Sequence, residues 1–217
     1  MIVLGLTGSI GMGKSHAAKT LRDLGARVHD SDRVVHGLLA AGGGGVAPVA
    51  ALFPDCVSGG SVDRRLLGAR VFGDPQALAA LEAILHPLVT ADRNRTMRQW
   101  QRQGVRLGVL DIPLLFETGA QRHCDLTVLV TAPAFVQRAR VLGRAGMTES
   151  RLRSILARQM PDSEKRRQAD VIVQTGLSKA FTRQQLHGLV QWTRGAAGLV
   201  WPPRYRRHER RARRGEG

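Results

Sequence analysis

Short apolar runs alternate with segments of helical spacing along this chain. Residues 2–6 form an unbroken apolar run that ends at Thr7-Gly8, which is typical of a buried parallel strand. Residues 16–24 follow with apolar positions at helical spacing, and Gly25 supplies a stop signal. Further strands are predicted at 26–29, 105–110, 126–130 and 170–173. This alternation predicts an α/β fold in three layers, with a five-stranded parallel sheet covered by helices on both faces.

The segment between the second and third strands has a different pattern. No strand is predicted within 33–103, where a run of glycines at 42–45 indicates a loop. Mostly helical patterns are found at 66–72, 76–85 and 88–101. An Arg-rich stretch with helical periodicity covers 135–168, with a helix start signal near 147–150, and a terminal helix is predicted at 179–195. The pattern therefore predicts a helical insertion and a second, basic helical region.

Composition narrows the class of protein. The 217 residues suffice for one α/β domain with a core, and the aromatic content of 4% suits an aliphatic sheet-and-helix core. The first apolar run is too short for a signal peptide, and no stretch approaches the roughly 18 apolar residues of a membrane span. The two cysteines, Cys56 and Cys124, are far apart and lack a C-x-x-C partner. We therefore expect a cytoplasmic protein.

The net charge of +16 calls for anionic partners. Residues 204–217 contain seven Arg and two Glu, a net charge of +5, which leaves +11 for the rest of the chain. Phosphate-containing ligands or nucleic acid would both suit such a surface. The end of the chain, 201–217, is predicted to be a disordered basic tail that binds nucleic acid or other polyanions weakly and nonspecifically.

Residues 8–15, Gly-Ser-Ile-Gly-Met-Gly-Lys-Ser, match the phosphate-loop pattern G-x-x-x-x-G-K-[ST] without a mismatch. Glycines let the backbone curl so that successive N–H groups face phosphate oxygens, and the helix that follows adds its positive end. Lys14 would reach the β- and γ-phosphates, and the Ser15 hydroxyl would bind Mg²⁺. A strand precedes the loop and a helix follows it, which an ordinary glycine-rich turn does not require. The motif predicts binding of MgATP.

Carboxylates follow two of the strands, at the sheet edge where ligands bind in such folds. Asp111 ends the third strand, where it could contact metal or substrate or could cap a turn. Asp30 and Asp32 follow the second strand, where a hydroxyl acceptor would need a carboxylate to orient it and take its proton. Spacing alone leaves an equal alternative, an Asx turn that caps the helix starting at Arg33.

Five stretches together resemble the dephospho-CoA kinase family over residues 1–195. Residues 6–15 resemble its L-T-G-G-I-G-S-G-K-S signature, 28–32 its V-I-D-A-D, 86–88 its H-P-[LI] and 111–117 its x-x-P-L-L-x-E. The family's basic lid region is matched by Arg140, Arg144, Gln159, Lys165 and Ala169-Asp170. Three loop residues depart from the signature: Ser9, Met12 and His16 replace Gly, Ser and Thr. Ser9 and Met12 lie at variable positions, whereas His16 adds bulk beside the Mg²⁺ site and is expected to weaken nucleotide affinity or simply to be solvated.

The resemblance implies transfer of the ATP γ-phosphoryl group to the ribose 3′-hydroxyl of dephospho-CoA, the last step of coenzyme A synthesis. It implies a core at 1–32 and 104–200, an acceptor-binding insertion at 33–103 and a lid at about 134–168. Asp32 would be the catalytic base and Asp30 would help to position it. His86 would approach the acceptor, unless it only caps a helix before Pro87.

The resemblance also assigns the remaining site residues. Lys14 and Arg140 would act on the transferring phosphoryl group, and Arg140 and Arg144, four apart, would share one helix face as an arginine clamp. Asp111 would lie with Asp30, Asp32 and His86 on the acceptor side. The nucleotide would be held by Gly8, Gly11, Met12, Gly13, Lys14, Ser15, His16 and Arg144.

Two other functions fit the residues less well. A kinase for another small acceptor, such as a nucleoside or nucleotide, would share the loop. A nucleic-acid-associated ATPase would explain the basic tail. The first is distinguished by its acceptor and the second by nucleic-acid-stimulated ATP hydrolysis.

Overall fold

The computed structural model describes residues 1–201, so nearly all of the basic tail predicted at 201–217 lies outside the described residues. The chain divides into two compact units. The first consists of Met1–Val28 together with the chain from Trp100 onward, and the second is His29–Gln99.

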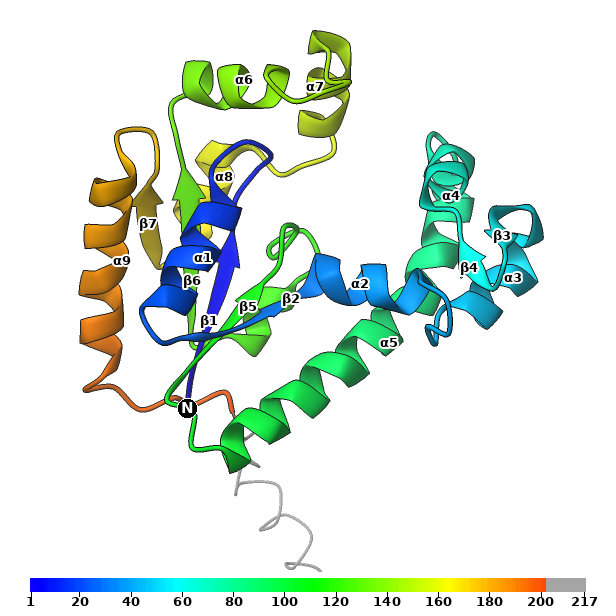
Figure 1. Cartoon of the computed structure of the whole chain (residues 1–217). Helices are drawn as coiled ribbons and strands as arrows, with labels where there is room; N and C mark the ends of the chain where they lie inside the picture. The colour runs from blue at the N-terminus through cyan, green and yellow to red at the C-terminus, as the bar shows by residue number, and fades with distance from the viewer. Residues whose placement is uncertain (202–217) are drawn as a thin grey trace, which may run out of the picture. The chain divides into compact units, whose positions relative to one another are not determined.

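The first unit is built on a parallel sheet of five strands in the order β2-β5-β1-β6-β7 (Figure 1). In β1, all six residues are buried, as expected for a central strand with helices on both faces. In the parallel pairing, Leu6 of β1 lies opposite Asp111, so the strands carrying the phosphate loop and this carboxylate end side by side. The strands are β1 (Ile2–Thr7), β2 (Arg27–Asp30), β5 (Leu107–Asp111), β6 (Leu126–Thr131) and β7 (Val171–Gln174). The predicted fold class is thus confirmed.

Two helices that are far apart in sequence pack together beside this sheet. The helix α1 (Lys14–Asp23) contacts α9 (Lys179–Thr193), and Figure 1 shows them side by side. Leu21 and Leu186 are fully buried in the shared core with the strand residues. The packing of α1 against α9 and the sheet therefore holds α1 in place, and the phosphate loop leads into the N-terminus of this helix.

The basic stretch predicted as helical at 135–168 consists of three separate helices. These are α6 (Ala134–Leu142), α7 (Glu149–Leu156) and α8 (Asp162–Gln168). Thr148 caps α7 by accepting a hydrogen bond from the Arg151 N–H, which agrees with the predicted start signal. Arg138 and Glu149 form an ion pair between the first two helices. A 3-10 turn, η2 (Ala120–His123), lies before β6 in the same unit.

The second unit has its own apolar core, which includes Leu39, Val49, Phe53, Leu67 and Leu81. Its elements are α2 (Ser31–Leu39), α3 (Val46–Leu52), the 3-10 turn η1 (Pro54–Cys56), β3 (Val57–Ser58), β4 (Ser61–Val62), α4 (Arg64–Val71) and α5 (Pro75–Arg102), the last of which runs into the first unit.

Two expectations for this unit were wrong. A small antiparallel hairpin, β3–β4, lies where no strand was predicted. The two helices expected at 76–85 and 88–101 are one continuous helix, α5, with Pro87 inside it. Proline lacks an N–H and usually interrupts a helix, but here the helix continues through it.

No helix among residues 1–201 is both long enough and apolar enough to cross a membrane.

Candidate active site

The phosphate loop connects β1 to α1 and turns sharply at two glycines. Gly11 and Gly13 have φ values of 77° and 89°, a region that residues with a Cβ rarely adopt. Space also requires glycine at position 13, because a Cβ there would lie 2.9 Å from Thr175 Oγ1. Gly13 is the N-cap of α1 and offers no side chain to the helix terminus. The loop thus exposes backbone groups, rather than a capping side chain, at the start of the helix.

The amides of the loop are available for an anion. Among the hydrogen bonds of residues 1–201, none uses the N–H of Gly11, Gly13, Lys14 or Ser15, whereas Met12 N–H donates to Ser9 O at 3.1 Å. Unpaired amides at a helix N-terminus, together with the positive end of the helix, form a phosphate-binding cradle. The local geometry therefore agrees with the function that the motif predicts.

The middle of the loop is held by two glutamine side chains from the lid region. Gln137 of α6 donates from Nε2 to the Ile10 carbonyl at 2.8 Å. Gln159, which follows α7, accepts a hydrogen bond from the Ile10 N–H at 3.1 Å. Both polar groups of Ile10 are thus paired with side chains that lie far away in sequence.

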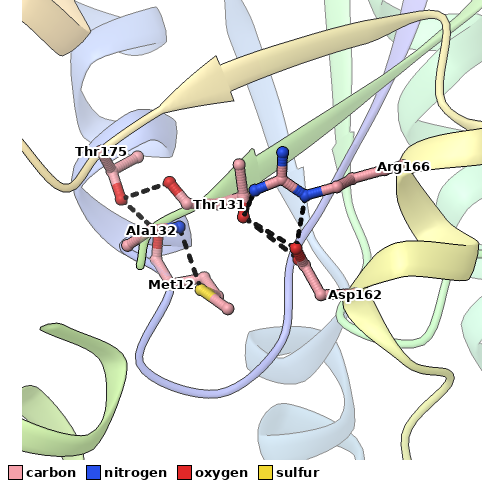
Figure 2. A network of polar contacts seen from close by, with 6 residues as sticks. All are labelled: Met12, Thr131, Ala132, Asp162, Arg166 and Thr175. Carbon is pink, nitrogen blue, oxygen red and sulfur yellow. Dashed lines mark hydrogen bonds and ion pairs between the residues drawn. The ribbon is translucent and has the colours of Figure 1, made fainter. Parts of the chain in front are cut away.

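The next part of the loop is bound by Thr175, in the turn after β7. The Thr175 hydroxyl donates to Met12 O at 2.6 Å, and the Ala132 N–H contacts Met12 Sδ at 3.1 Å, as Figure 2 shows. Arg140 of α6 donates to the Thr175 carbonyl at 2.6 Å, to its hydroxyl at 3.2 Å and, more weakly, to Gly11 O at 3.4 Å. Thr175 thus connects the phosphate loop with the arginine that was predicted to act on the phosphoryl group.

Lys14 forms an ion pair with Asp111 at the adjacent strand end. The ammonium lies 2.6 Å from Asp111 Oδ1, and the carboxylate side chain is 4% exposed. The two residues meet because β1 and β5 are parallel neighbours, and both strands end at this edge. This ion pair fixes the position of the Lys14 ammonium beside the loop. Ser15 is exposed on the first turn of α1, whereas the His16 side chain is half-buried and its Nε2 atom lacks a hydrogen-bond partner.

A second buried ion pair supports the segment that carries Gln159. Lys165 of α8 is 0% exposed, and its ammonium lies 2.8 Å from Glu117 Oε1, in an ion-pair contact rather than a well-aligned hydrogen bond. The same carboxylate oxygen accepts a hydrogen bond from Met160 N–H at 2.9 Å. Glu117 therefore fixes the residue next to Gln159.

The end of β6 is tied to α8 in a similar way. The Thr131 hydroxyl donates to Asp162 Oδ2 at 3.0 Å and accepts from Arg166 Nη2 at 2.8 Å (Figure 2). Arg166 also pairs with Asp162 at 2.6 Å. These contacts connect the start of α8 with the strand that lies next to β1.

The expectation that Arg140 and Arg144 share one helix face was wrong. The helix α6 ends at Leu142, so Arg144 lies beyond it in an exposed turn, whereas Arg140 remains in the last turn of the helix. Gly143 is the C-cap of α6 and Arg144 follows it outside the helix, so the two guanidinium groups do not share a helix face. Of these two arginines, Arg140 is the one that donates a hydrogen bond to the phosphate loop, at Gly11 O.

Three of the residues predicted on the acceptor side, Asp30, Asp32 and His86, belong to the second unit, whereas the fourth, Asp111, lies in the first unit. Asp30 is the N-cap of α2 and accepts a hydrogen bond from the Arg33 N–H at 3.0 Å, as the turn-capping alternative expected. Asp32 is exposed in the first turn of the same helix. His86 is exposed in the interior of α5 and therefore does not cap a helix before Pro87.

Sequence reasoning missed several of the supporting side chains. Neither Gln137 nor Thr175 belongs to a motif that the sequence analysis identified. Both act on backbone carbonyls of the loop, which any residue could supply. Gln159 and Lys165 were marked only by the resemblance.

The protein residues fit a Mg²⁺ ion that is held mainly by nucleotide phosphates. Residues 1–201 contain no group of three or more His, Cys, Asp or Glu side chains that could hold a metal. Mg²⁺ in kinases keeps few protein ligands besides substrate oxygens. The exposed hydroxyl of Ser15 is a suitable single ligand beside the amides of the loop.

Comparisons with known proteins agree with this geometry. Residues 2–179 match the family model described as dephospho-CoA kinase. A dephospho-CoA kinase from Mesorhizobium japonicum is 53% identical over 199 residues, covering 91% of this chain and 100% of that protein. One from Paramagnetospirillum magneticum is 59% identical over 166 residues, covering 76% of this chain and 78% of that protein.

Two solved structures share the fold. TT1252 from Thermus thermophilus has a TM-score of 0.77 and 34% identity, and the match covers 91% of this chain and 98% of that one. The dephospho-CoA kinase from Campylobacter jejuni has a TM-score of 0.60 and 22% identity, with coverages of 88% and 96%.

Proposed function

Because the chain belongs to the dephospho-CoA kinase family, we propose that it transfers the γ-phosphoryl group of ATP to the ribose 3′-hydroxyl of dephospho-CoA. The family assignment confirms the resemblance drawn from the motifs, and it makes the chain an ATP-dependent phosphotransferase of coenzyme A synthesis. The comparisons lend no support to the alternative of a nucleic-acid-associated ATPase.

The observation that carries the proposal is the phosphate loop with its unpaired amides and its lysine. The N–H groups of Gly11 and Gly13 and the ammonium of Lys14 are donors suited to the β- and γ-phosphates of ATP. Mg²⁺, which Ser15 would help to hold, supplies positive charge to the same phosphates. A preformed set of donors stabilises the transition state without reorganising during the reaction.

Lys14 has two partners in this scheme. In the structure its ammonium contacts Asp111, and phosphate binding would bring a second anionic group to the same nitrogen. We infer that Asp111 restricts the Lys14 side chain before the nucleotide binds. A free lysine side chain would lose rotamer entropy on binding phosphate, and a side chain that is already restricted loses less. Asp111 thus acts on the nucleotide through Lys14, although a direct contact with metal or acceptor was also expected.

In the acceptor step, Asp32 serves as the base. The 3′-hydroxyl oxygen attacks the γ-phosphorus, the bond from that phosphorus to the β–γ bridging oxygen breaks, and the hydroxyl proton passes to the Asp32 carboxylate. The exposed position of Asp32 at the start of α2 supports this role, because its oxygens are open to a substrate. Asp30, occupied by the Arg33 amide, would fix the start of that helix and so position its neighbour.

Arg140 is proposed to act on the transferring group from the lid side. Its guanidinium is already placed at Gly11 and Thr175, next to the loop. Arg144 and His86 are proposed to contact nucleotide and acceptor only when these are bound, because both side chains are exposed. His16 would lie beside the phosphates, where its bulk replaces a smaller threonine.

The acceptor is tested by an ADP-release assay with purified protein and MgATP. Separate reactions contain dephospho-CoA, adenosine, AMP, single-stranded nucleic acid or no acceptor. We expect rapid ADP release only with dephospho-CoA, and a product that carries one added phosphate on its ribose 3′-oxygen. Faster transfer to adenosine or AMP would instead favour a nucleoside or nucleotide kinase, and release stimulated by nucleic acid would favour an ATPase.

A further inference from the structure

Thr175 occupies a position that the reaction scheme above leaves unused. It lies in the turn after β7, is 5% exposed and belongs to the same unit as the phosphate loop. Its hydroxyl donates to Met12 O at 2.6 Å, a short distance for a hydrogen bond between two neutral groups. The same hydroxyl lies 3.2 Å from Thr131 O, a longer alternative (Figure 2).

The hydroxyl is not needed to hold its own turn in place. The Thr175 N–H already donates to Thr131 O at 2.8 Å, which attaches the end of β7 to β6. Its carbonyl accepts from Arg140 Nη2 at 2.6 Å, which attaches it to α6. The side-chain bond to Met12 O is therefore an additional contact, and it is the shortest that the hydroxyl makes, because Arg140 Nη1 donates to the same hydroxyl at 3.2 Å.

This bond determines where the next amide points. The peptide unit between Met12 and Gly13 is planar and trans, so its C=O and N–H point in opposite directions. With the carbonyl turned to Thr175, the Gly13 N–H faces away from Thr175, and no residue within 1–201 accepts a hydrogen bond from it. Residues with a Cβ rarely adopt the φ of 89° found at Gly13, and the absence of a Cβ also leaves room for the threonine.

We propose that Thr175 is a positioning residue that aims the Gly13 amide at the nucleotide phosphates by holding the Met12 carbonyl behind the loop. This rests on the proposed function, since it assumes that the loop binds the phosphates of ATP. Without the hydroxyl, the Met12–Gly13 peptide can rotate, and one phosphate-binding donor is no longer fixed. Gln137 holds the Ile10 carbonyl by the same type of contact, but it is a longer side chain on a different element.

The test removes only the hydroxyl. Thr175→Val keeps the shape of the side chain, and Thr175→Ser keeps the hydroxyl. We expect Thr175→Val to weaken ADP binding, measured by calorimetry, roughly 3- to 10-fold, the worth of one net hydrogen bond. The KM for ATP should rise by a similar factor. Thr175→Ser should bind ADP nearly as the wild type does. Adenosine, measured by competition with ADP, should bind equally well to all three proteins because it has no phosphates.

A matched control is available in the same unit. Thr193 is buried at 7% exposure in α9, and its hydroxyl donates to Val190 O at 2.7 Å, away from the loop. Thr193→Val should leave ADP affinity unchanged. The proposal is overturned if Thr175→Val binds ADP as the wild type does, if it loses adenosine and ADP affinity equally, or if Thr193→Val weakens ADP binding as much.

The test still decides the question if one variant does not fold. If Thr175→Val does not fold, the Thr175→Ala and Thr175→Ser proteins carry the same comparison, and equal ADP affinity in the two overturns the proposal. Its failure can also be told apart from failure of the proposed function. A wild-type protein that binds ADP but does not phosphorylate dephospho-CoA contradicts the proposed acceptor, while the Thr175 comparison can still be made.

Discussion

The phosphate loop of the first unit and the acceptor-side residues of the second unit are held in place very differently. Backbone groups of Ile10 and Met12 are hydrogen-bonded to side chains that come from distant parts of the sequence. Asp32 and His86, in contrast, are exposed on helix surfaces, and Asp30 is bonded only within its own helix. The loop is organised by protein, whereas the acceptor residues have few protein partners.

This difference fits the two tasks of a phosphoryl-transfer enzyme. Phosphate binding depends on donors that are fixed before the ligand arrives, because reorganising them would raise the barrier. A catalytic base instead needs an open side chain that the acceptor hydroxyl can reach. Changes at the loop and its supports should therefore affect nucleotide binding or folding, and changes at Asp32 should affect mainly the chemical step.

Removing the loop lysine should produce the largest effect. Lys14→Ala deletes the charge that stabilises negative charge on the γ-phosphoryl group, and we expect kcat to fall about 10²- to 10³-fold, as for other fixed electrostatic donors. The fold should remain intact, which circular dichroism can check. Near-normal turnover in the folded variant would contradict the assignment of the phosphate loop.

Breaking the buried ion pair should produce the next largest effect, on folding rather than on chemistry. Glu117→Ala leaves the ammonium of Lys165 buried without its partner, and we expect the free energy of unfolding to fall by about 3 kcal/mol. Urea denaturation measures this. Because a buried pair can be replaced by apolar residues at little cost, the double variant Glu117→Leu/Lys165→Met should recover much of the loss. No difference between single and double variants would show that the pair is not coupled.

A smaller effect should separate the two roles of Asp30. Asp30→Ala removes the N-cap of α2 and should cost about 1 kcal/mol of stability. Asp30→Asn retains a good cap but removes the charge, so its stability should be close to wild type and its turnover should drop less than that of Asp32→Asn. Asp63→Ala, which removes the cap of α4, is the control for stability loss without a loss of turnover. A turnover loss in Asp63→Ala equal to that in Asp30→Ala would contradict a specific role for Asp30.

The smallest effect concerns the acid sensitivity of the second unit. Burial raises the pKa of Asp92, but hydrogen bonds from Arg95 and His29 outweigh this and leave the pKa below its usual value. A carboxyl with a lowered folded-state pKa contributes stability above its unfolded pKa of about 3.9 and loses it as the pH falls through the folded value. Asp92→Asn should therefore flatten the decline in unfolding free energy below about pH 4. An unchanged slope in the variant would show that Asp92 does not contribute.

Much of the phosphate-binding side follows from sequence because the chemistry is local there. Gly11, Gly13 and Lys14 lie within eight consecutive residues, and a strand and a helix flank them, so pattern and spacing predict the loop. The five strands were also predicted, and β1 most clearly, because a central parallel strand is apolar on both faces.

Other features could not be read from the pattern. The hairpin strands β3 and β4 have two residues each, which is too short for any periodicity. The helix α5 continues through Pro87, whereas a proline inside a helical pattern usually predicts a break. Arg144 was placed on a helix that ends before it. Thr175 acts on a backbone carbonyl far away in sequence, and no sequence pattern records such a contact.

In the proposed scheme the loop binds the nucleotide and Asp32 serves as the base for the acceptor, and the Asp32→Asn variant separates these two roles. Asp32→Asn keeps the size of the side chain but removes its charge and its ability to accept a proton. In Asp32→Asn protein saturated with MgATP and dephospho-CoA, we expect single-turnover ADP formation to slow about 10²- to 10⁴-fold, with the ATP dissociation constant close to wild type. A single-turnover rate equal to wild type would contradict the role of Asp32 as base, and would leave it as only a first-turn residue of α2.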